Sequence, residues 1–296
     1  MRILILGGDG MLGHQLYLTL HQQHDVKVTL RQDMYAYQQF NLFDHHNSYA
    51  GVNVCHLDSV IKVFADFKPD AVINAVGIVK QRKLSNDIVT SLEINAHFPH
   101  RLALLCKIAK ARLIHISTDC VFSGRRGNYT EEDVSDAEDI YGKSKYLGEV
   151  HDKHCITLRS SIIGLELSHK TGLIEWFLAQ KGQIKGFKRA IYSGLTTQEM
   201  SRLIERILVD DQDISGVWHV ASQESVSKYK LLDYLSKLLE RDDIIIEPDQ
   251  EFSCDRSLNG DRFKQMTGYV SPTWQTMLQE LAHHIKMRQA QYVISQ

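Results

Sequence analysis

Short apolar segments alternate with amphipathic segments along the first half of the chain. Arg2–Leu6 is almost wholly apolar, and residues 10–23 then place Leu12, Leu16 and Leu20 on one helical face. Such alternation is typical of a parallel sheet with helices on both faces and right-handed connections. The expected strands are Arg2–Leu6, Val26–Leu30, Val52–Leu57, Ala71–Ala75, Leu113–Ser117 and Cys155–Ser160, and the expected helices are Gly10–Gln23, Ser59–Phe67, Ile88–Lys110 and Tyr141–Asp152. The pattern predicts an α/β fold with a doubly wound parallel sheet.

Two regions depart from this alternation. Residues 31–51 carry several Tyr and Phe among polar residues, and we interpret them as an insertion packed as a surface flap. Later in the chain the pattern becomes mostly helical. We expect helices at Gly172–Gln180, Gln198–Val209, Lys228–Glu240 and Pro272–Met287, and strands at Val217–Val220 and Ile244–Glu247. The sheet domain is therefore expected to span 1–160 and part of 185–222, with a smaller, mostly helical part at 161–184 and 223–296.

Composition excludes several classes of protein. The 296 residues are 43% hydrophobic and 24% charged, with a formal net charge of -2. This balance disfavours nucleic acid and anionic membranes as main partners, and no apolar run approaches the ~18 residues that span a bilayer. The apolar start Met1–Leu6 breaks at Gly7 without a cleavage-like site, so we expect a strand and a cytoplasmic protein. The five cysteines are scattered without metal-ligand spacing, so no metal site is predicted.

Regularly spaced glycines follow the first strand. Gly7, Gly10 and Gly13 lie where a strand turns into a helix, and glycine there permits a tight turn. It also lets a pyrophosphate approach the backbone N–H groups at the helix N-terminus. We therefore predict a Rossmann-type dinucleotide site with contacts at Gly7, Gly10, Met11, Leu12 and Gly13. A glycine-rich turn without a ligand is the alternative that this spacing leaves open.

Later strand ends are expected to complete the cofactor site. Arg31 ends the second strand, where a basic residue suits the 2′-phosphate of NADPH. NADH stays open, because Arg31 can equally be a solvated charge and Asp33 lies just beyond. Asp58 either lies near the adenine ring or caps the helix that follows. The small residues expected to let the cofactor lie against the fourth strand are Asn74, Ala75, Val76 and Gly77.

A hydroxyl, a phenol and an amine follow in order. Ser117 and Thr118 end the fifth strand, and carboxyl ends of strands hold the ligands of open α/β sheets. Tyr141 and Lys145 are four residues apart on an expected helix and point the same way. An ammonium and a cationic nicotinamide beside a phenol favour the phenolate and lower its pKa from about 10. We predict Thr118, Tyr141 and Lys145 as catalytic residues, with Ser117, Tyr141 and Lys145 contacting the cofactor.

These motifs, in this order, resemble the extended short-chain dehydrogenase/reductase family and, within it, the dTDP-4-dehydrorhamnose reductase group. Residues 117–124 resemble the group's Ser-Thr-Asp-Tyr-Val-Phe-Asp-Gly pattern, and residues 141–149 resemble its Tyr-Gly-x-[Ser/Thr]-Lys-x-x-Gly-Glu pattern. The similarity covers nearly the whole chain. It continues at Asn95-Ala96, Arg159, Gly216–Ala221 and Arg256–Phe263.

The resemblance implies a role for each catalytic residue. Thr118 would hydrogen-bond a 4-keto oxygen, Tyr141 would donate the proton, and Lys145 would hold the nicotinamide ribose. Cys120 in place of the usual tyrosine and Ser123 in place of the usual aspartate leave the identity of the sugar open. The predicted substrate contacts, including cations for a diphosphate, are Cys120, Val121, Phe122, Arg189 and Arg256.

The expected reaction is NAD(P)H-dependent reduction of the 4-keto group of a 4-keto-6-deoxy nucleotide sugar, for bacterial surface polysaccharide. Related dehydratases carry a glutamate base where this chain has Cys120, and a thiol is a poor substitute. A 4-epimerase with the same three residues stays an alternative, as does a non-catalytic cofactor-binding regulatory subunit. The resemblance also implies a homodimer.

Overall fold

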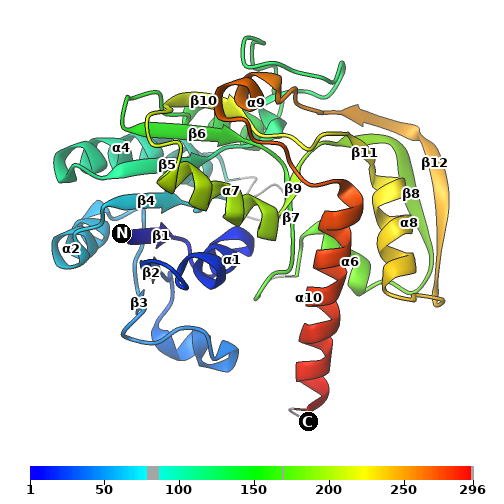
Figure 1. Cartoon of the computed structure of the whole chain (residues 1–296), viewed down its shortest axis with the longest axis horizontal. Coiled ribbons are helices and arrows are strands. Elements are labelled where there is room, and N and C mark those ends of the chain that lie inside the picture. Colours follow the sequence, from blue (N-terminus) through cyan, green and yellow to red (C-terminus); the bar gives the residue numbers. More distant parts are fainter. Residues whose placement is uncertain (79–86, 169, 295–296) are drawn as a thin grey trace.

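The computed structural model describes residues 1–78, 87–168 and 170–294, and its centre is a seven-stranded parallel sheet (Figure 1). The strand order is β10-β6-β5-β4-β1-β2-β3. The chain therefore winds outward from β1 in both directions, and ligand sites form at the carboxyl ends of strands near such a reversal. The predicted doubly wound sheet is confirmed. Its strands are β1 Arg2–Leu6, β2 Asp25–Thr29, β3 Ser48–Tyr49, β4 Ala71–Asn74, β5 Arg112–Ile116, β6 Cys155–Arg159 and β10 Gly216–His219.

Helices cover both faces of this sheet. Ile5 of β1 is buried in one core with Leu16 of α1 and Ile204 of α7. Leu4, the preceding residue of β1, is buried in a second core with Val63 of α2. Successive side chains of one strand point to opposite faces, so β1 supplies both cores. These helices are α1 Met11–Leu20, α2 Leu57–Phe67, α4 Phe98–Ala109, α5 Ile140–Leu147 and α7 Thr197–Val209.

The third strand lies earlier in the chain than the sequence predicted. β3 is Ser48–Tyr49 and pairs with β2, whereas the expected strand Val52–Leu57 is not a strand. Two residues are too few to show an alternating pattern. Val52 and Val54 give a misleading signal because they are buried in the second core without pairing in the sheet.

Residues 31–51, interpreted as a surface flap, pack against the sheet. Their 3-10 helix Met34–Phe40 contributes Tyr37, which is buried in the first core with Phe43. The Tyr37 hydroxyl donates a hydrogen bond to Asp9 Oδ2 at 3.0 Å. Asp9 belongs to the glycine turn after β1, so this segment braces that turn.

Two expected helices differ from the observed ones. The expected helix Ile88–Lys110 is divided by a π-helical turn at Glu93–His97, which separates α3 (Ile88–Leu92) from α4. Helix α5 ends at Leu147, where Gly148 closes it, instead of continuing to Asp152. A π-helical turn often occurs at a functional site.

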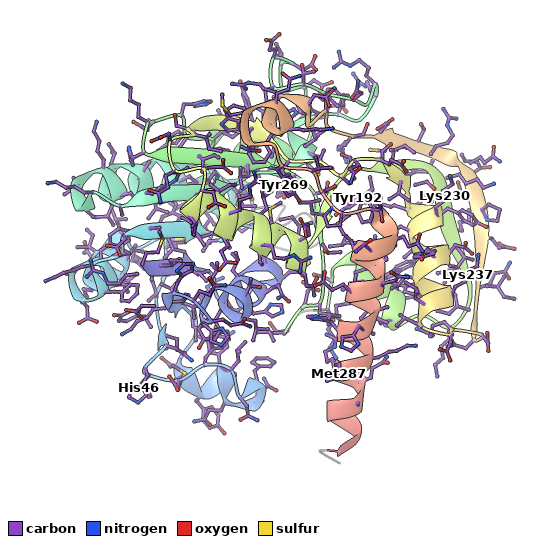
Figure 2. The ribbon with its side chains drawn as sticks, in the orientation of Figure 1. His46, Tyr192, Lys230, Lys237, Tyr269 and Met287 are labelled. Carbon is purple, nitrogen blue, oxygen red and sulfur yellow. The ribbon has the colours of Figure 1, made fainter. Side chains whose placement is uncertain are left out.

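The C-terminal part adds a second sheet of order β11-β8-β12 to its helices (Figure 1). Strand β8 was not predicted, and β12 extends well beyond the expected Ile244–Glu247. Lys230 and Lys237 are exposed on α8, whereas Tyr192 ends β8 (Figure 2). No helix of the described residues is long and apolar enough to cross a membrane. The remaining elements are α6 Leu173–Leu178, β7 Ile162–Ile163, β8 Gly182–Tyr192, β9 Leu195–Thr196, β11 Val226–Ser227, α8 Lys228–Leu238, β12 Ile244–Asp255, α9 Asp261–Thr267 and α10 Trp274–Ile294.

Candidate active site

The glycine turn after β1 is shaped for close approach of a ligand. Gly7 has a φ of 84°, and Gly10 donates its N–H to the Gly7 carbonyl oxygen at 3.1 Å. A Cβ on Gly13 would lie 2.0 Å from that same oxygen, so only glycine fits. No described side chain caps α1, so the N–H groups of its first residues, Met11 and Leu12, can face a phosphate. The turn therefore fits the pyrophosphate of a dinucleotide.

The other residues expected to contact the cofactor differ in their exposure. Arg31 after β2 and Asp58 in the first turn of α2 are both exposed. Asn74 is buried: its Nδ2 lies 3.1 Å from His115 Nδ1, and its Oδ1 accepts the Val76 N–H at 3.2 Å. The Asn74 side chain therefore shapes the end of β4 instead of presenting its amide to a ligand. The partly exposed residues at this strand end are Ala75, Val76 and Gly77.

Thr118 and Tyr141 meet because the 3-10 turn Asp119–Val121 packs on the first turn of α5. Thr118 caps the 3-10 turn, and its Oγ1 accepts the Cys120 N–H at 3.1 Å. Gly142 packs so closely that a Cβ there would lie 2.1 Å from the Cys120 carbonyl oxygen. This contact brings the Tyr141 hydroxyl beside the Thr118 side chain, close enough for that side chain to act on the Tyr141 pKa.

Burial controls the protonation of Tyr141 and Lys145. It raises the pKa of Tyr141 well above the ordinary value of 10, and Cys120 adds to this effect. Burial is the largest effect on this pKa and keeps the phenol protonated, while the lowering expected from Lys145 together with a bound nicotinamide stays a prediction. Lys145 is 4% exposed and its Nζ donates to the Ile116 carbonyl oxygen at 2.6 Å. Burial lowers the pKa of Lys145 to about 8, opposed by Glu149, so the amine is mainly charged at neutral pH.

Ser117, expected to contact the cofactor, is turned inward. It is buried, and its hydroxyl donates to Glu149 Oε1 at 2.8 Å. The Ser117 hydroxyl therefore faces the Glu149 carboxylate in the interior. The side chain of Ser117 instead joins the end of β5 to the segment that follows α5.

Cys120 and Arg256 lie together beside the catalytic candidates. Burial raises the pKa of the Cys120 thiol to about 12, so this thiol is neutral and is not a general base. Arg256 is half-buried, and its Nε donates to the Phe122 carbonyl oxygen at 2.7 Å. Its charge interacts with Cys120 and Asp119. The structure thus brings a guanidinium from the C-terminal part to the end of β5.

Three of the predicted substrate contacts occupy other positions. Val121 and Phe122 have no exposed surface and form a small core with Tyr129, whose ring stacks on Phe122 at 4.2 Å. The prediction of substrate contact fails for both side chains because the 3-10 turn directs them inward. Arg189 is exposed on β8, where it pairs in register with Ser253, and none of the described contacts links it to Tyr141.

Asn95 forms hydrogen bonds with two segments that border the candidate site. It lies in the π-helical turn, where its Oδ1 accepts the Ile78 N–H at 2.9 Å. Its Nδ2 donates to the Ile78 carbonyl oxygen at 3.1 Å and to Ser144 Oγ at 3.2 Å. A Cβ on Gly148 would lie 1.9 Å from the Asn95 carbonyl oxygen. Asn95 therefore joins the loop after β4 to α5, which carries Tyr141.

Two further residues beside Thr118 were missed from the sequence. Thr118 Oγ1 donates to Asp119 Oδ1 at 3.2 Å, and the Ser161 hydroxyl donates to Asp119 Oδ2. The Tyr192 hydroxyl is buried beside Asp119, Cys120 and Ser161. The signal for Ser161 was its position just after β6. Tyr192 had no signal, because β8 itself was not predicted.

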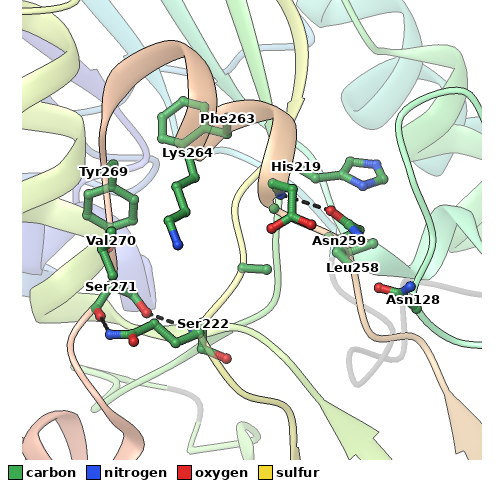
Figure 3. Close-up of a pocket in the computed structure, with 14 residues that line it drawn as sticks. Asn128, His219, Ser222, Leu258, Asn259, Phe263, Lys264, Tyr269, Val270 and Ser271 are labelled. Carbon is green, nitrogen blue, oxygen red and sulfur yellow. Dashed lines mark hydrogen bonds between the residues drawn. The ribbon is translucent and has the colours of Figure 1, made fainter.

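A cavity of about 360 Å³ lies elsewhere, between the end of β10 and α9 (Figure 3). Its lining includes His219, Asn259 and Lys264 but none of the three catalytic candidates. It is therefore separate from the candidate active site. Within the described residues, no group of three His, Cys, Asp or Glu side chains could hold a metal ion.

The family of the chain follows from comparison with known proteins. A family model described as "RmlD substrate binding domain" matches residues 1–172, which include the glycine turn and all three catalytic candidates. The chain belongs to the RmlD family. The suspected resemblance to dTDP-4-dehydrorhamnose reductases is confirmed at the level of this family.

Individual relatives cover most of this RmlD-family chain. The dTDP-4-dehydrorhamnose reductase of Aggregatibacter actinomycetemcomitans is 26% identical over 238 residues, covering 77% of this chain and 76% of that protein. The spore coat polysaccharide biosynthesis protein SpsK of Bacillus subtilis is 30% identical over 235 residues, with 77% and 76% covered. The crystal structure of a dTDP-4-dehydrorhamnose reductase from Bacillus anthracis in complex with NADP has a TM-score of 0.76 at 19% identity, covering 95% of this chain and 98% of that one. The structural likeness shows the fold.

Proposed function

We propose that this RmlD-family protein reduces the 4-keto group of a 4-keto-6-deoxy nucleotide sugar with NAD(P)H, in bacterial surface-polysaccharide synthesis. One observation carries the proposal: the Thr118 and Tyr141 side chains are neighbours at the end of β5, where the buried Lys145 amine bonds the Ile116 carbonyl oxygen. Relatives named as a dTDP-4-dehydrorhamnose reductase and a polysaccharide biosynthesis protein support this choice of substrate.

The chain's own residues have complementary parts in this reaction. A dinucleotide whose pyrophosphate is held at the glycine turn would supply the hydride to C4 from its nicotinamide, with Lys145 holding the nicotinamide ribose. Tyr141, kept protonated by burial, gives its proton to the O4 oxygen and so completes the alcohol. Thr118 hydrogen-bonds that oxygen, and the charged Lys145 amine stabilises the phenolate left on Tyr141. Exposed Arg31 supports NADPH over NADH.

Arg256 is the best placed of the predicted cations for the substrate diphosphate, because its guanidinium reaches the end of β5 from the C-terminal part. This supports the division into a cofactor domain of 1–160 with part of 185–222, and a substrate-binding part of 161–184 and 223–296. We also propose a homodimer, because the apolar side chains of Leu104 and Ile108 on α4 and of Leu147 on α5 are exposed. We propose a cytoplasmic location because the reaction uses reduced nicotinamide.

A substrate panel tests the function. The protein is incubated with NADPH and 4-keto-6-deoxy sugars linked to dTDP or UDP, and the nicotinamide absorbance is followed. We expect one NADPH oxidised for each alcohol formed. Sugar epimers interconverted without net NADPH loss would instead identify a 4-epimerase. Cofactor binding without turnover of any sugar would favour a non-catalytic subunit. A dehydratase is disfavoured by the neutral Cys120 thiol.

A further inference from the structure

A fully buried ion pair lies directly behind the catalytic residues. Arg159, the last residue of β6, donates from Nε and Nη2 to the two carboxylate oxygens of Glu149, both at 2.7 Å. The side chains are 5% and 1% exposed. Glu149 Oε1 also accepts the Ser117 hydroxyl at 2.8 Å. One carboxylate therefore joins the end of β5, the end of β6 and the segment after α5.

These connections end at the residues that the proposed reaction needs. Ser117 is followed directly by Thr118, and Glu149 lies four residues after Lys145. Lys145 donates to the Ile116 carbonyl oxygen, one residue before Ser117. The ion pair thus fixes the strand end that carries Thr118 relative to the helix that carries Lys145.

The groups around Lys145 have different effects on the charge of its amine. Glu149 acts on the Lys145 amine and favours its charged form, whereas burial disfavours it. The other titratable neighbours are His115 from β5 and Tyr141 from α5 itself. Burial lowers the pKa of His115 far below its ordinary value, with Lys145 and His100 of α4 adding to the effect, so the imidazole is neutral. Glu149 is therefore the negative charge that supports the Lys145 ammonium.

The Arg159 side of the ion pair contacts a neutral histidine ring. Arg159 Nη1 lies 3.2 Å from His219 Nε2, and His219 Nδ1 lies 3.0 Å from the Tyr129 carbonyl oxygen. Burial, with Arg159 adding to it, lowers the pKa of His219 to about 3, so this ring carries no charge at neutral pH. Arg159 therefore offsets the charge of Glu149 and holds its carboxylate in place.

Buried ion pairs are weak evidence for stability, because apolar residues of similar volume often serve as well in a protein core. A carboxylate that bonds both Ser117 and Arg159 suggests another reason for its presence. We infer that Glu149, held by Arg159, is a positioning residue that orients Thr118 and Lys145 and keeps the Lys145 amine charged for its work with cofactor and substrate. The catalytic meaning of this role rests on the proposed function, but the effect of Glu149 on Lys145 does not.

Direct titration of Lys145 tests the inference without substrate or cofactor. The protein is prepared with lysine labelled with 13C at Cε, and the resonance missing in K145R is assigned to Lys145. Its shift is followed from about pH 6 to about pH 11 in wild type, E149Q and R159Q. We expect E149Q to lower the Lys145 pKa by on the order of one unit, because Glu149 is the anion that acts on Lys145 among the described residues. R159Q breaks the same ion pair but should leave that pKa unchanged or raise it.

A double variant guards against unfolding. E149Q with R159Q removes both charges of the ion pair, so neither partner is left charged alone, and it retains two amides that can hydrogen-bond. We expect it to lower the Lys145 pKa as E149Q does, while E149D, which keeps the charge, should stay near wild type. Equal shifts in E149Q and R159Q, or no shift in E149Q and the double variant, would overturn the inference. These outcomes are read without NADPH oxidation, so they are independent of whether the sugar reductase proposal holds.

Discussion

Gly142 and Cys120 are in direct backbone contact: a Cβ on Gly142 would lie 2.1 Å from the Cys120 carbonyl oxygen. Helix α5 and the 3-10 turn after β5 can approach so closely only because residue 142 lacks a side chain. The contact sets the distance between the Tyr141 phenol, one residue earlier, and the Thr118 hydroxyl. The geometry of the proposed reaction therefore depends on a glycine that takes no part in the chemistry.

Replacing Gly142 with alanine should separate these two elements. We expect G142A to lower kcat/KM by about 100-fold, because a shift of about 1 Å at a catalytic group has that effect. NADPH affinity should change little, since the glycine turn is untouched. G260A is the matched control, because a Cβ there meets its nearest neighbour at 3.4 Å. Steady-state kinetics and fluorescence titration with NADPH check the prediction, and full activity in G142A would contradict it.

Tyr141→Phe removes the proton donor and leaves the ring. We expect kcat to fall by about 100-fold to 10,000-fold, the usual contribution of a general acid. The dissociation constant for NADPH should stay within a few-fold of wild type. Tyr146→Phe is the control on the same helix, because Tyr146 is 43% exposed. Turnover close to wild type in Y141F would exclude Tyr141 as the proton donor.

The central fold could be predicted from the sequence because β1, β4, β5 and β6 are short strands buried on both faces. Such strands appear in the sequence as short apolar runs. Strand β8, Gly182–Tyr192, left none, because charged residues interrupt it and about half of its residues are exposed. The sequence prediction placed strand β3 wrongly because a strand of two residues cannot show alternation of apolar and polar positions. In both cases pairing in three dimensions decided the structure, and local sequence did not report it.

The same limit applies to the site. Gly7, Thr118, Tyr141 and Lys145 could be proposed from the sequence because the chemistry expected of them depends on local spacing. Residues that meet only across the fold left no such signal. Glu149 and Ser117 are 32 positions apart and bond because the fold brings the segment after α5 to the end of β5. The inward turn of Val121 and Phe122 likewise follows from a partner, Tyr129, that sequence spacing does not pair with them.

Arg256→Gln tests the proposed diphosphate contact. Removing the guanidinium should raise KM for the nucleotide sugar by about 10-fold to 100-fold, since charge-assisted bonds contribute about 1.5–3 kcal/mol each. We expect a much smaller change in kcat, because Arg256 lies beside Cys120 and Asp119 and not at the proton donor. Arg125→Gln is the control, with its side chain 74% exposed. A fall in kcat at constant KM would place Arg256 in the chemical step instead.

Lys145→Met should stabilise the protein while it removes activity. Burial lowers the Lys145 pKa from 10.5 to about 8, so at neutral pH the folded state carries an ammonium that the unfolded chain accommodates more easily. Relief of this penalty should raise the free energy of unfolding by on the order of 1–3 kcal/mol at pH 7. Loss of the hydrogen bond to the Ile116 carbonyl oxygen offsets part of the gain.

The pH dependence of the difference in unfolding free energy between K145M and wild type gives a sharper test. Between pH 8 and pH 10.5 the folded protein releases the Lys145 proton while the unfolded chain retains it. Over this window the unfolding free energy of wild type should therefore rise relative to that of K145M, and the advantage of the variant should shrink. Urea unfolding at a series of pH values measures it, with K143M, at an exposed lysine of the same helix, as the control. A K145M advantage that is constant across this window would show that the buried charge is not its source.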